Sequence, residues 1–332
     1  MISLQAILVM TCPCLGVCSP FSYKWGGTMI VNIDQNQCAG CGICGDICPR
    51  HILETITQND EKNIIVSPER SHLCLKCGHC VAVCPSSCIM VDGLKSEEFF
   101  PFKESGIHSD QLLSLFSQRR SIRRYKNKRI SRNIIHQIVE AAQRSPTGTA
   151  SKSTGVIVVD NPQILAIFSD HVYKLYEDLE KNLKNPIARF IIKRKIGPKM
   201  FRTLQDFVML GMQWYIHWYK QGKSNEILRD CPALMLFHSP IFEPMSAENC
   251  LVSAFHSIMM AQVLGIGTCF NDLIPPACNM VPEIRNLLDL PEDREVYASI
   301  TMGYSKYRFK QMPQRKLAEF RYIDSFGGGP NR

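Results

Sequence analysis

Two short stretches near the N-terminus, CAGCGICGDICP at residues 38–49 and CLKCGHCVAVCP at residues 74–85, decide the fold of the first part of the chain. Both follow the spacing C-x2-C-x2-C-x3-C-P. Of the sixteen cysteines, twelve lie in the first 88 residues and four are scattered through the rest. Such close spacings suit metal ligation better than disulfide cross-links. We therefore expect two domains with different chemistry, in a reducing compartment, the cytoplasm.

The duplicated spacing resembles that of a two-cluster bacterial-type ferredoxin domain, and the resemblance covers residues 30–93. In such domains three cysteines of a motif hold one [4Fe–4S] cluster and the fourth crosses over to the other cluster. The resemblance implies two ligand sets: Cys38, Cys41, Cys44 and Cys84 for one cluster, and Cys74, Cys77, Cys80 and Cys48 for the second. A pair of zinc sites is the alternative, but zinc needs neither the third cysteine nor the C-P ending.

Length and composition set the outer limits. A chain of 332 residues with 45% hydrophobic and 20% charged residues is long enough for two globular domains. No apolar run reaches the 18 residues of a membrane-spanning helix. We interpret residues 1–29 as an N-terminal extension that does not fold, which makes Cys12, Cys14 and Cys18 incidental. We expect a linker at residues 94–109.

The net charge of +8 is concentrated in KNLKNPIARFIIKRKIGPKMFR, residues 181–202, which holds eight Lys or Arg and no acidic residue. A basic helical stretch with interleaved apolar residues is most often a solvated face. It also suits docking to an acidic electron carrier or to an anionic membrane surface. No motif for reading nucleic-acid bases accompanies it.

Beyond the linker, residues 110–325 alternate between helical and strand patterns. We expect a helix from Ser109 or Asp110, a second helix capped by Ser131, and an apolar helix at residues 247–264 that is buried all round. Apolar runs at 155–160, 232–238 and 296–304 predict strands, and residues 161–230 predict a long helical region. The predicted class of the whole chain is α+β.

An arginine cluster, QRRSIRRY, lies between the first two of these helices. Guanidinium groups beside a hydroxyl suit a phosphate dianion. With RSPTGT (144–149), GIGTCFND (265–272) and MPQRK (312–316), the segment resembles the nitroreductase family of FMN flavoproteins over residues 110–325. The resemblance implies the following cofactor-binding residues: Arg119, Arg120, Ser121, Arg123, Pro146, Thr147, Gly148, Gly267 and Arg315. The chain departs from the family turn N-x-Q-P at Ala150, Lys152 and Ser153.

The two halves together predict an FMN-dependent oxidoreductase. Iron–sulfur clusters deliver single electrons, whereas FMN accepts single electrons and hands on a hydride. We expect a small acceptor such as a nitro compound, a quinone or an activated alkene, an external ferredoxin or other electron donor, and a homodimer as in the family. We assign no catalytic acid or base from the sequence. The alternatives are a non-catalytic electron-transfer or redox-sensing protein with a degenerate flavin domain, and reductive dehalogenation or flavin destruction on the same fold.

Overall fold

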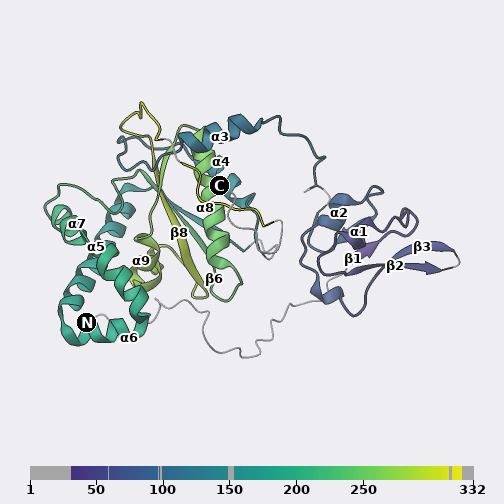
Figure 1. Ribbon diagram of the computed structural model, residues 1–332, viewed down its shortest axis with the longest axis horizontal. Coiled ribbons are helices and arrows are strands. Elements are labelled where there is room, and N and C mark those ends of the chain that lie inside the picture. Colours follow the sequence, from purple (N-terminus) through teal and green to yellow (C-terminus); the bar gives the residue numbers. More distant parts are fainter. Residues whose placement is uncertain are drawn as a thin grey trace.

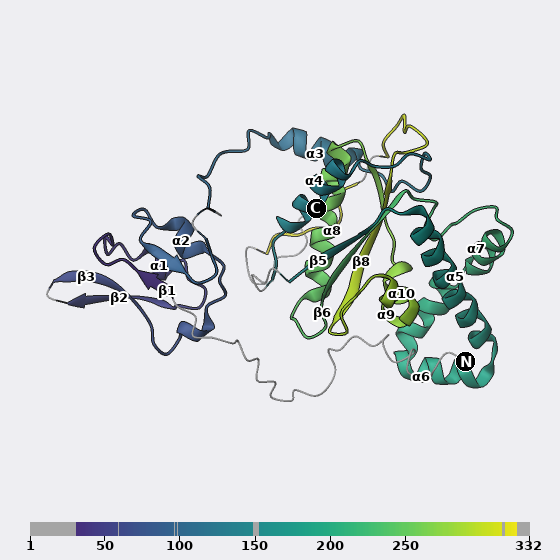
Figure 2. The ribbon, with the colours of Figure 1, turned by 180° about the vertical axis from the view of Figure 1, so that it is seen from behind.

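The computed structural model describes residues 31–58, 60–95, 97, 99–148, 153–313 and 316–323. Figures 1 and 2 show two bodies joined by extended chain; we call residues 31–95 the N-terminal body and 109–323 the C-terminal body. The predicted extension at residues 1–29 lies outside the described residues. Among the helices described, none is both long and apolar enough to cross a membrane.

The N-terminal body consists of two small antiparallel sheets and two short helices. Strand β1 (Val31–Ile33) pairs with β4 (Ile89–Val91), and β2 (Leu53–Gln58) pairs with β3 (Glu61–Val66). Helix α1 (Ile43–Asp46) lies in the first cysteine motif and α2 (His79–Val83) in the second, which is preceded by a 3-10 turn at Ser71–Leu73. Several motif cysteines belong to the small apolar core of this body.

The C-terminal body is built on one antiparallel sheet of four strands in the order β5-β6-β8-β7. These strands are β5 (Gly155–Val159), β6 (Ala233–Pro240), β7 (Gly267–Phe270) and β8 (Arg294–Gly303). The three predicted strands are thereby confirmed. Strand β7 falls in the glycine-containing segment for which the sequence predicted no strand. Its four residues are too few to carry an alternating pattern, and pairing with β8 defines them.

Helices cover both faces of this sheet (Figures 1 and 2). On one face, Met235 and Phe237 of β6 pack with α4 (Arg132–Gln143) and α8 (Ser246–Val263). On the other face, Leu234 and Leu236 pack with the remaining helices. These are α5 (Pro162–Lys184), α7 (Met212–Lys220), α9 (Ile274–Met280) and α10 (Pro282–Leu287). The alternation of β6 side chains between two apolar layers explains why this strand is a continuous apolar run.

Local signals located the helix ends well. Helix α3 (Ser109–Gln118) begins where predicted, and the Ser131 side chain caps α4 by accepting a hydrogen bond from the Ile134 backbone N–H at 3.5 Å. The helix predicted at 247–264 is α8, but it is not buried all round. Its residues Leu251 and Phe255 are 49% and 42% exposed, because within one chain only one side of α8 packs on the sheet.

The predicted helical region 161–230 contains four segments. After α5 come α6 (Pro186–Thr203), a π-helical turn at Leu204–Val208, and α7. Helix α6 is interrupted at Gly197, which has a φ of 76° and is followed by Pro198. Ile192, Ile196, Phe201 and Leu204 form a separate small core in this part of the chain.

Candidate cluster cavities and cofactor groove

Two cavities in the N-terminal body are each lined by four cysteines of the two motifs. Cys48, Cys74, Cys77 and Cys80 line the first cavity. Cys38, Cys41, Cys44 and Cys84 line the second, together with Cys88, which lies outside both motifs. The fourth cysteine of each sequence motif thus lies at the cavity of the other motif, because the chain brings the end of one motif beside the start of the other.

Glycines allow the backbone to follow this path. Helix α1 begins after Gly42 and α2 after Gly78, with φ angles of 78° and 77° that side-chain-bearing residues rarely adopt. At Gly40 a Cβ atom would lie 2.1 Å from the carbonyl oxygen of Lys62 on β3. The first motif can therefore approach β3 only with glycine at this position.

The environment of the cysteine thiols is uneven. Burial raises the pKa of Cys80 to about 11. Burial acts in the same direction at Cys84, but hydrogen bonds from Cys88 and from nearby backbone N–H groups outweigh it and lower the pKa of Cys84. Cys88 is 4% exposed and belongs to the apolar core, with its sulfur 3.4 Å from that of Cys84.

The cysteines surround a space instead of meeting at a point. Within the part of the chain that the structure describes, no three Cys, His, Asp or Glu side chains converge closely enough to hold a single metal ion. The four motif thiols at each cavity match the number of cysteine ligands that a [4Fe–4S] cube takes.

A groove of about 750 Å³ in the C-terminal body brings early and late parts of the sequence together. Arg120 and Ile122 line it from the loop after α3, Gly267 from the start of β7, and residues 305–312 from the segment after β8. The backbone N–H of Ile122 donates to the Thr268 carbonyl at 2.8 Å, and Ser121 bridges to Thr268. A Cβ atom on Gly267 would lie 2.6 Å from Ile122 Cγ1, so this close approach requires glycine.

Only one of the three guanidinium nitrogens of Arg120 donates a hydrogen bond to the described residues. Its Nη1 donates to the carbonyl oxygens of Ser117 at 2.8 Å and of Arg119 at 2.7 Å. Its Nε and Nη2 are buried and have no hydrogen-bond partner among the described residues. Leaving buried donors unsatisfied costs about 1 to 3 kcal/mol each, more for a charged group. Two free donors on one planar guanidinium can bind a phosphate or a carboxylate by two parallel hydrogen bonds.

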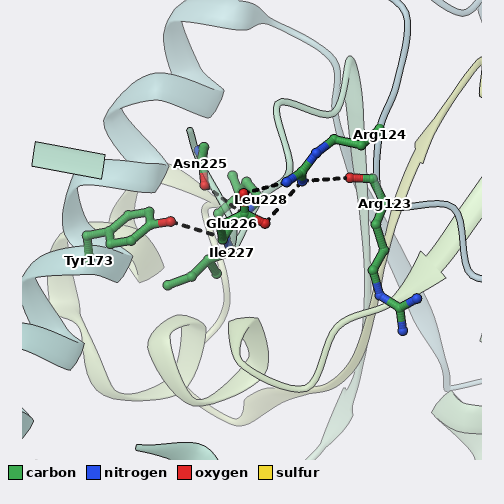
Figure 3. A network of polar contacts seen from close by, with 7 residues as sticks. All are labelled: Arg123, Arg124, Tyr173, Asn225, Glu226, Ile227 and Leu228. Carbon is green, nitrogen blue, oxygen red and sulfur yellow. Dashed lines mark hydrogen bonds and ion pairs between the residues drawn. The ribbon is translucent and has the colours of Figure 1, made fainter. Parts of the chain in front are cut away.

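Arg123 and Arg124 have different surroundings (Figure 3). Arg124 donates two hydrogen bonds to the carboxylate of Glu226, at 3.0 and 2.6 Å, and one to the Arg123 carbonyl oxygen at 3.1 Å. Figure 3 shows the Arg123 guanidinium pointing away from this network. Arg123, a predicted site residue, therefore does not pair with Glu226. The sequence did not predict that Arg124 would anchor this loop.

Glu226 connects the helical region to the arginine loop. Its side chain is 11% exposed, and the neighbouring Ile227 N–H donates to the Tyr173 hydroxyl of α5 at 3.1 Å. The Tyr173 ring stacks on Tyr219 of α7 with centroids 3.8 Å apart. Burial alone would raise the pKa of Glu226, but the hydrogen bonds and charge of Arg124 hold that pKa below its ordinary value. Glu226 is therefore ionised at neutral pH.

Pro146, Thr147 and Gly148 lie elsewhere, beside the start of α8. The backbone N–H of Gly148 donates to Asn249 Oδ1 at 2.9 Å, and a Cβ on Gly148 would overlap the Met245 side chain. Asn249 is 2% exposed, and its Nδ2 has no partner among the described residues. None of the three predicted turn residues lines the 750 Å³ groove.

The end of this turn is anchored from β8. Arg294 donates to the Ser153 carbonyl oxygen and, through Nε, to His238 Nδ1 at 2.7 Å. Burial, followed by the charge of Arg294, lowers the pKa of His238 to about 4. His238 is therefore neutral near pH 7 and accepts from Arg294. The departures at Ala150 and Lys152 lie outside the described residues.

The late cation predicted from the sequence, Arg315, also lies outside the described residues. Arg308 and Lys310 line the groove that Arg120 and Gly267 share. Sequence reasoning missed both. The available signal was the run YRFKQ directly after the last predicted strand, in which two cations lie closer to that strand than Arg315 does.

Comparisons with known proteins match both bodies. Residues 116–304 match the model of the nitroreductase family, and residues 37–89 match a 4Fe-4S dicluster domain. Ferredoxin-3 of Nostoc sp. is 25% identical over 76 residues, which are 19% of this chain and 78% of that protein. An uncharacterized ferredoxin of Methanocaldococcus jannaschii is 30% identical over 66 residues, 20% of this chain and 82% of that protein. Among solved structures, a nitroreductase with bound FMN from Bacteroides fragilis covers 64% of this chain and 99% of its own, at 17% identity and a TM-score of 0.49.

We predict that Glu226→Gln destabilises the C-terminal body at pH 7 by roughly 1 to 3 kcal/mol, because a charged hydrogen-bond partner of Arg124 is lost. The folded-state pKa of Glu226 is lowered, so the stabilisation is complete above the unfolded-state pKa and is lost as the pH falls through the folded-state pKa. The difference from wild type should therefore stay the same from pH 7 down to about pH 5 and shrink as the pH falls below about 4.3, the ordinary pKa of Glu. Urea unfolding followed by tryptophan fluorescence measures it.

The matched control is Glu140→Gln, which breaks the exposed pair of Glu140 with Arg144 on α4. It should change the stability little at any pH, because solvent screens an exposed ion pair. A Glu226→Gln effect as small as this control, or one that does not change with pH, would contradict the anchoring role of Glu226.

Proposed function

Because the chain belongs to the nitroreductase family and carries a 4Fe-4S dicluster domain ahead of it, we propose that it is an FMN-dependent oxidoreductase that receives electrons through two [4Fe–4S] clusters. The observation that carries the proposal is the presence, in one chain, of two cavities that are each lined by four motif cysteines and of a groove with unsatisfied buried guanidinium donors. The acceptor is a small organic molecule such as a nitro compound, a quinone or an activated alkene.

For the clusters, we propose the crossed ligand sets. Cys38, Cys41, Cys44 and Cys84 would hold one, and Cys48, Cys74, Cys77 and Cys80 the other. The grouping of the same cysteines around two cavities supports this assignment. The N–H of Ile52, 3.5 Å from Cys48 Sγ, is a donor of the kind that stabilises a ligating thiolate.

For the flavin, the chain's own residues supply phosphate recognition. Arg120 would donate its free Nε and Nη2 to the FMN phosphate, with Arg119, Ser121 and Arg123 in the same loop and Arg308 and Lys310 across the groove. FMN, when bound, accepts single electrons and transfers a hydride to the acceptor. We propose Pro146, Thr147 and Gly148 as the turn near the flavin ring, Gly267 at its other side, and Arg315 as a further phosphate contact.

We further propose that the protein is a homodimer, as is usual in the family. Leu251, Val252 and Phe255 form an exposed apolar stripe on α8, and Phe116 of α3 extends it, with its ring centroid 6.3 Å from that of Phe255. Large exposed apolar patches mark interaction sites. An external ferredoxin or a comparable one-electron donor in the cytoplasm would reduce the clusters.

The cluster assignment predicts how pairs of cysteine substitutions combine. The full chain should hold about eight irons and Cys48→Ala about four. Adding Cys77→Ala to Cys48→Ala should cost no further iron, because both changes affect the same cluster. Adding Cys41→Ala instead should remove the second cluster as well. Iron and acid-labile sulfide are counted after anaerobic purification.

The opposite pattern, with the Cys48→Ala and Cys41→Ala pair retaining about four irons, would show that each motif ligates its own cluster. Two zinc ions per chain and no labile sulfide would overturn the iron–sulfur proposal altogether.

Arg120→Met should weaken FMN binding by about ten- to a hundredfold, because charge-assisted hydrogen bonds to phosphate are worth roughly 1.5 to 3 kcal/mol. Flavin fluorescence titration of the deflavinated protein measures the dissociation constant. Arg132→Met is the matched control, because Arg132 lies exposed at the start of α4 and its side chain pairs with Asp160 at 3.5 Å. Equal affinities in the two variants would remove Arg120 from the site.

A fragment that begins at Ile107, just ahead of the His108 cap of α3, tests electron delivery. We expect it to bind FMN and to keep hydride-driven turnover of a quinone or nitroaromatic compound. It should lose turnover driven by reduced ferredoxin, because the cluster relay is missing. Anaerobic assays of full chain and fragment with both donors measure this. Equal ferredoxin-driven rates would contradict the relay, and a full chain without flavin would favour the electron-transfer or redox-sensing alternative.

A further inference from the structure

Helix α6 folds into a hairpin that no part of the proposed reaction uses. The turn at Gly197 and Pro198 reverses the chain, so that residues 186–196 run beside residues 198–208, which we call the α6 hairpin. Arg189 of the first half donates to Gln205 of the second at 3.3 Å and lies 5.8 Å from the centre of the Phe201 ring. The inner sides of both halves meet in the small core around Ile192 and Leu204.

The outer surface of the hairpin carries large apolar side chains. Phe207 is 83% exposed and Ile187 71% exposed, and the contact of Arg189 with Gln205 places these two residues at the same level of the hairpin. Further exposed apolar residues lie on the hairpin and at the start of α7: Phe190, Met200, Leu210 and Trp214. Apolar side chains gathered this close together and this exposed form the kind of patch that marks an interaction surface.

The same surface is strongly cationic. Helix α6 contains six basic residues and no acidic one: Arg189, Lys193, Arg194, Lys195, Lys199 and Arg202. A hollow of about 650 Å³ is lined by Lys199, Arg202 and Phe207 together, so cations and apolar groups share one surface. Asp206, which also lines this hollow, pairs with Arg202 at 3.3 Å.

We propose that the α6 hairpin, with the start of α7, docks peripherally on an anionic phospholipid surface. Basic residues interleaved with Phe and Trp are the composition of interfacial helices, whose apolar side chains enter the headgroup boundary while Lys and Arg meet anionic lipids. An acidic protein partner would satisfy the cations, but it would not by itself explain aromatic side chains that protrude into solvent.

The position of the hairpin fits this role. Figures 1 and 2 both show α6 and α7 at the edge of the C-terminal body, on the side away from α4 and α8. Docking there leaves the exposed stripe on α8 accessible to a second copy. Attachment to a bilayer would favour acceptors that dissolve in lipid, such as quinones. That consequence rests on the proposed function, whereas the docking itself does not.

Vesicle flotation of the full-length protein tests the proposal. The protein should float with vesicles of phosphatidylcholine and phosphatidylglycerol in equal amounts, and much less with phosphatidylcholine alone or at high salt. Trp214 emission should shift to shorter wavelength on binding. The variant Lys199→Glu/Phe207→Ser should bind roughly tenfold more weakly or worse, since it reverses one charge and removes the most exposed aromatic group of the hairpin.

The matched control is Lys103→Glu/Phe102→Ser, which makes the same two changes in the exposed linker, where Phe102 is 95% exposed. It should float like wild type. A second variant, Lys193→Glu/Phe190→Ser, changes the other half of the hairpin and should repeat the loss. Circular dichroism and cofactor content establish that each variant is folded.

Flotation of both hairpin variants at the wild-type level would overturn the proposal. So would equal binding of wild type to neutral and anionic vesicles, because the cations would then contribute nothing. Failure of the wild type to bind either kind of vesicle would also show that the membrane proposal is wrong. If the wild type then binds an acidic ferredoxin and Lys199→Glu/Phe207→Ser abolishes that binding, the hairpin is a protein-docking surface.

Discussion

The hydrogen bond from the Ile122 N–H to the Thr268 carbonyl, 2.8 Å long, is the contact on which the cofactor groove depends. The loop after α3 has no helix or sheet of its own. This bond, together with the buried Tyr125 hydroxyl against Ile122 and Thr301, fixes the loop along β7 and β8. Because the backbone is held on one side, Arg120 can present two buried donors on the other.

A comparable constraint acts in the N-terminal body. Strand β1 precedes the first cysteine motif and β4 follows the second, and their antiparallel pairing sets Ile33 opposite Ile89. The Asp34 N–H then donates to the Cys88 carbonyl at 2.9 Å. This pairing brings the end of the second motif to the start of the first, which is why Cys84 lines the cavity of Cys38 and not that of its own motif.

The helical region between β5 and β6 contacts the arginine loop through one segment and exposes another segment to solvent. Its last turn carries Glu226, which holds Arg124 and with it the arginine loop, while Tyr173 and Tyr219 stack behind it. Its middle, the α6 hairpin, turns aromatic and basic side chains outward. This region can therefore hold the arginine loop from inside the fold and still offer a surface to the outside, because separate segments carry the two roles.

Features that depend on neighbouring residues were readable from the chain alone. The cysteine spacing, the Ser131 cap of α4, the start of α3 at Ser109 and the three apolar strands are set by local sterics and short-range hydrogen bonds. Tertiary structure decided strand β7, the ion pair of Arg124 with Glu226 across 102 residues, the place of Arg308 and Lys310, and the exposed side of α8. Each of these joins residues far apart in the chain, and no spacing or periodicity records which distant partner a side chain will meet.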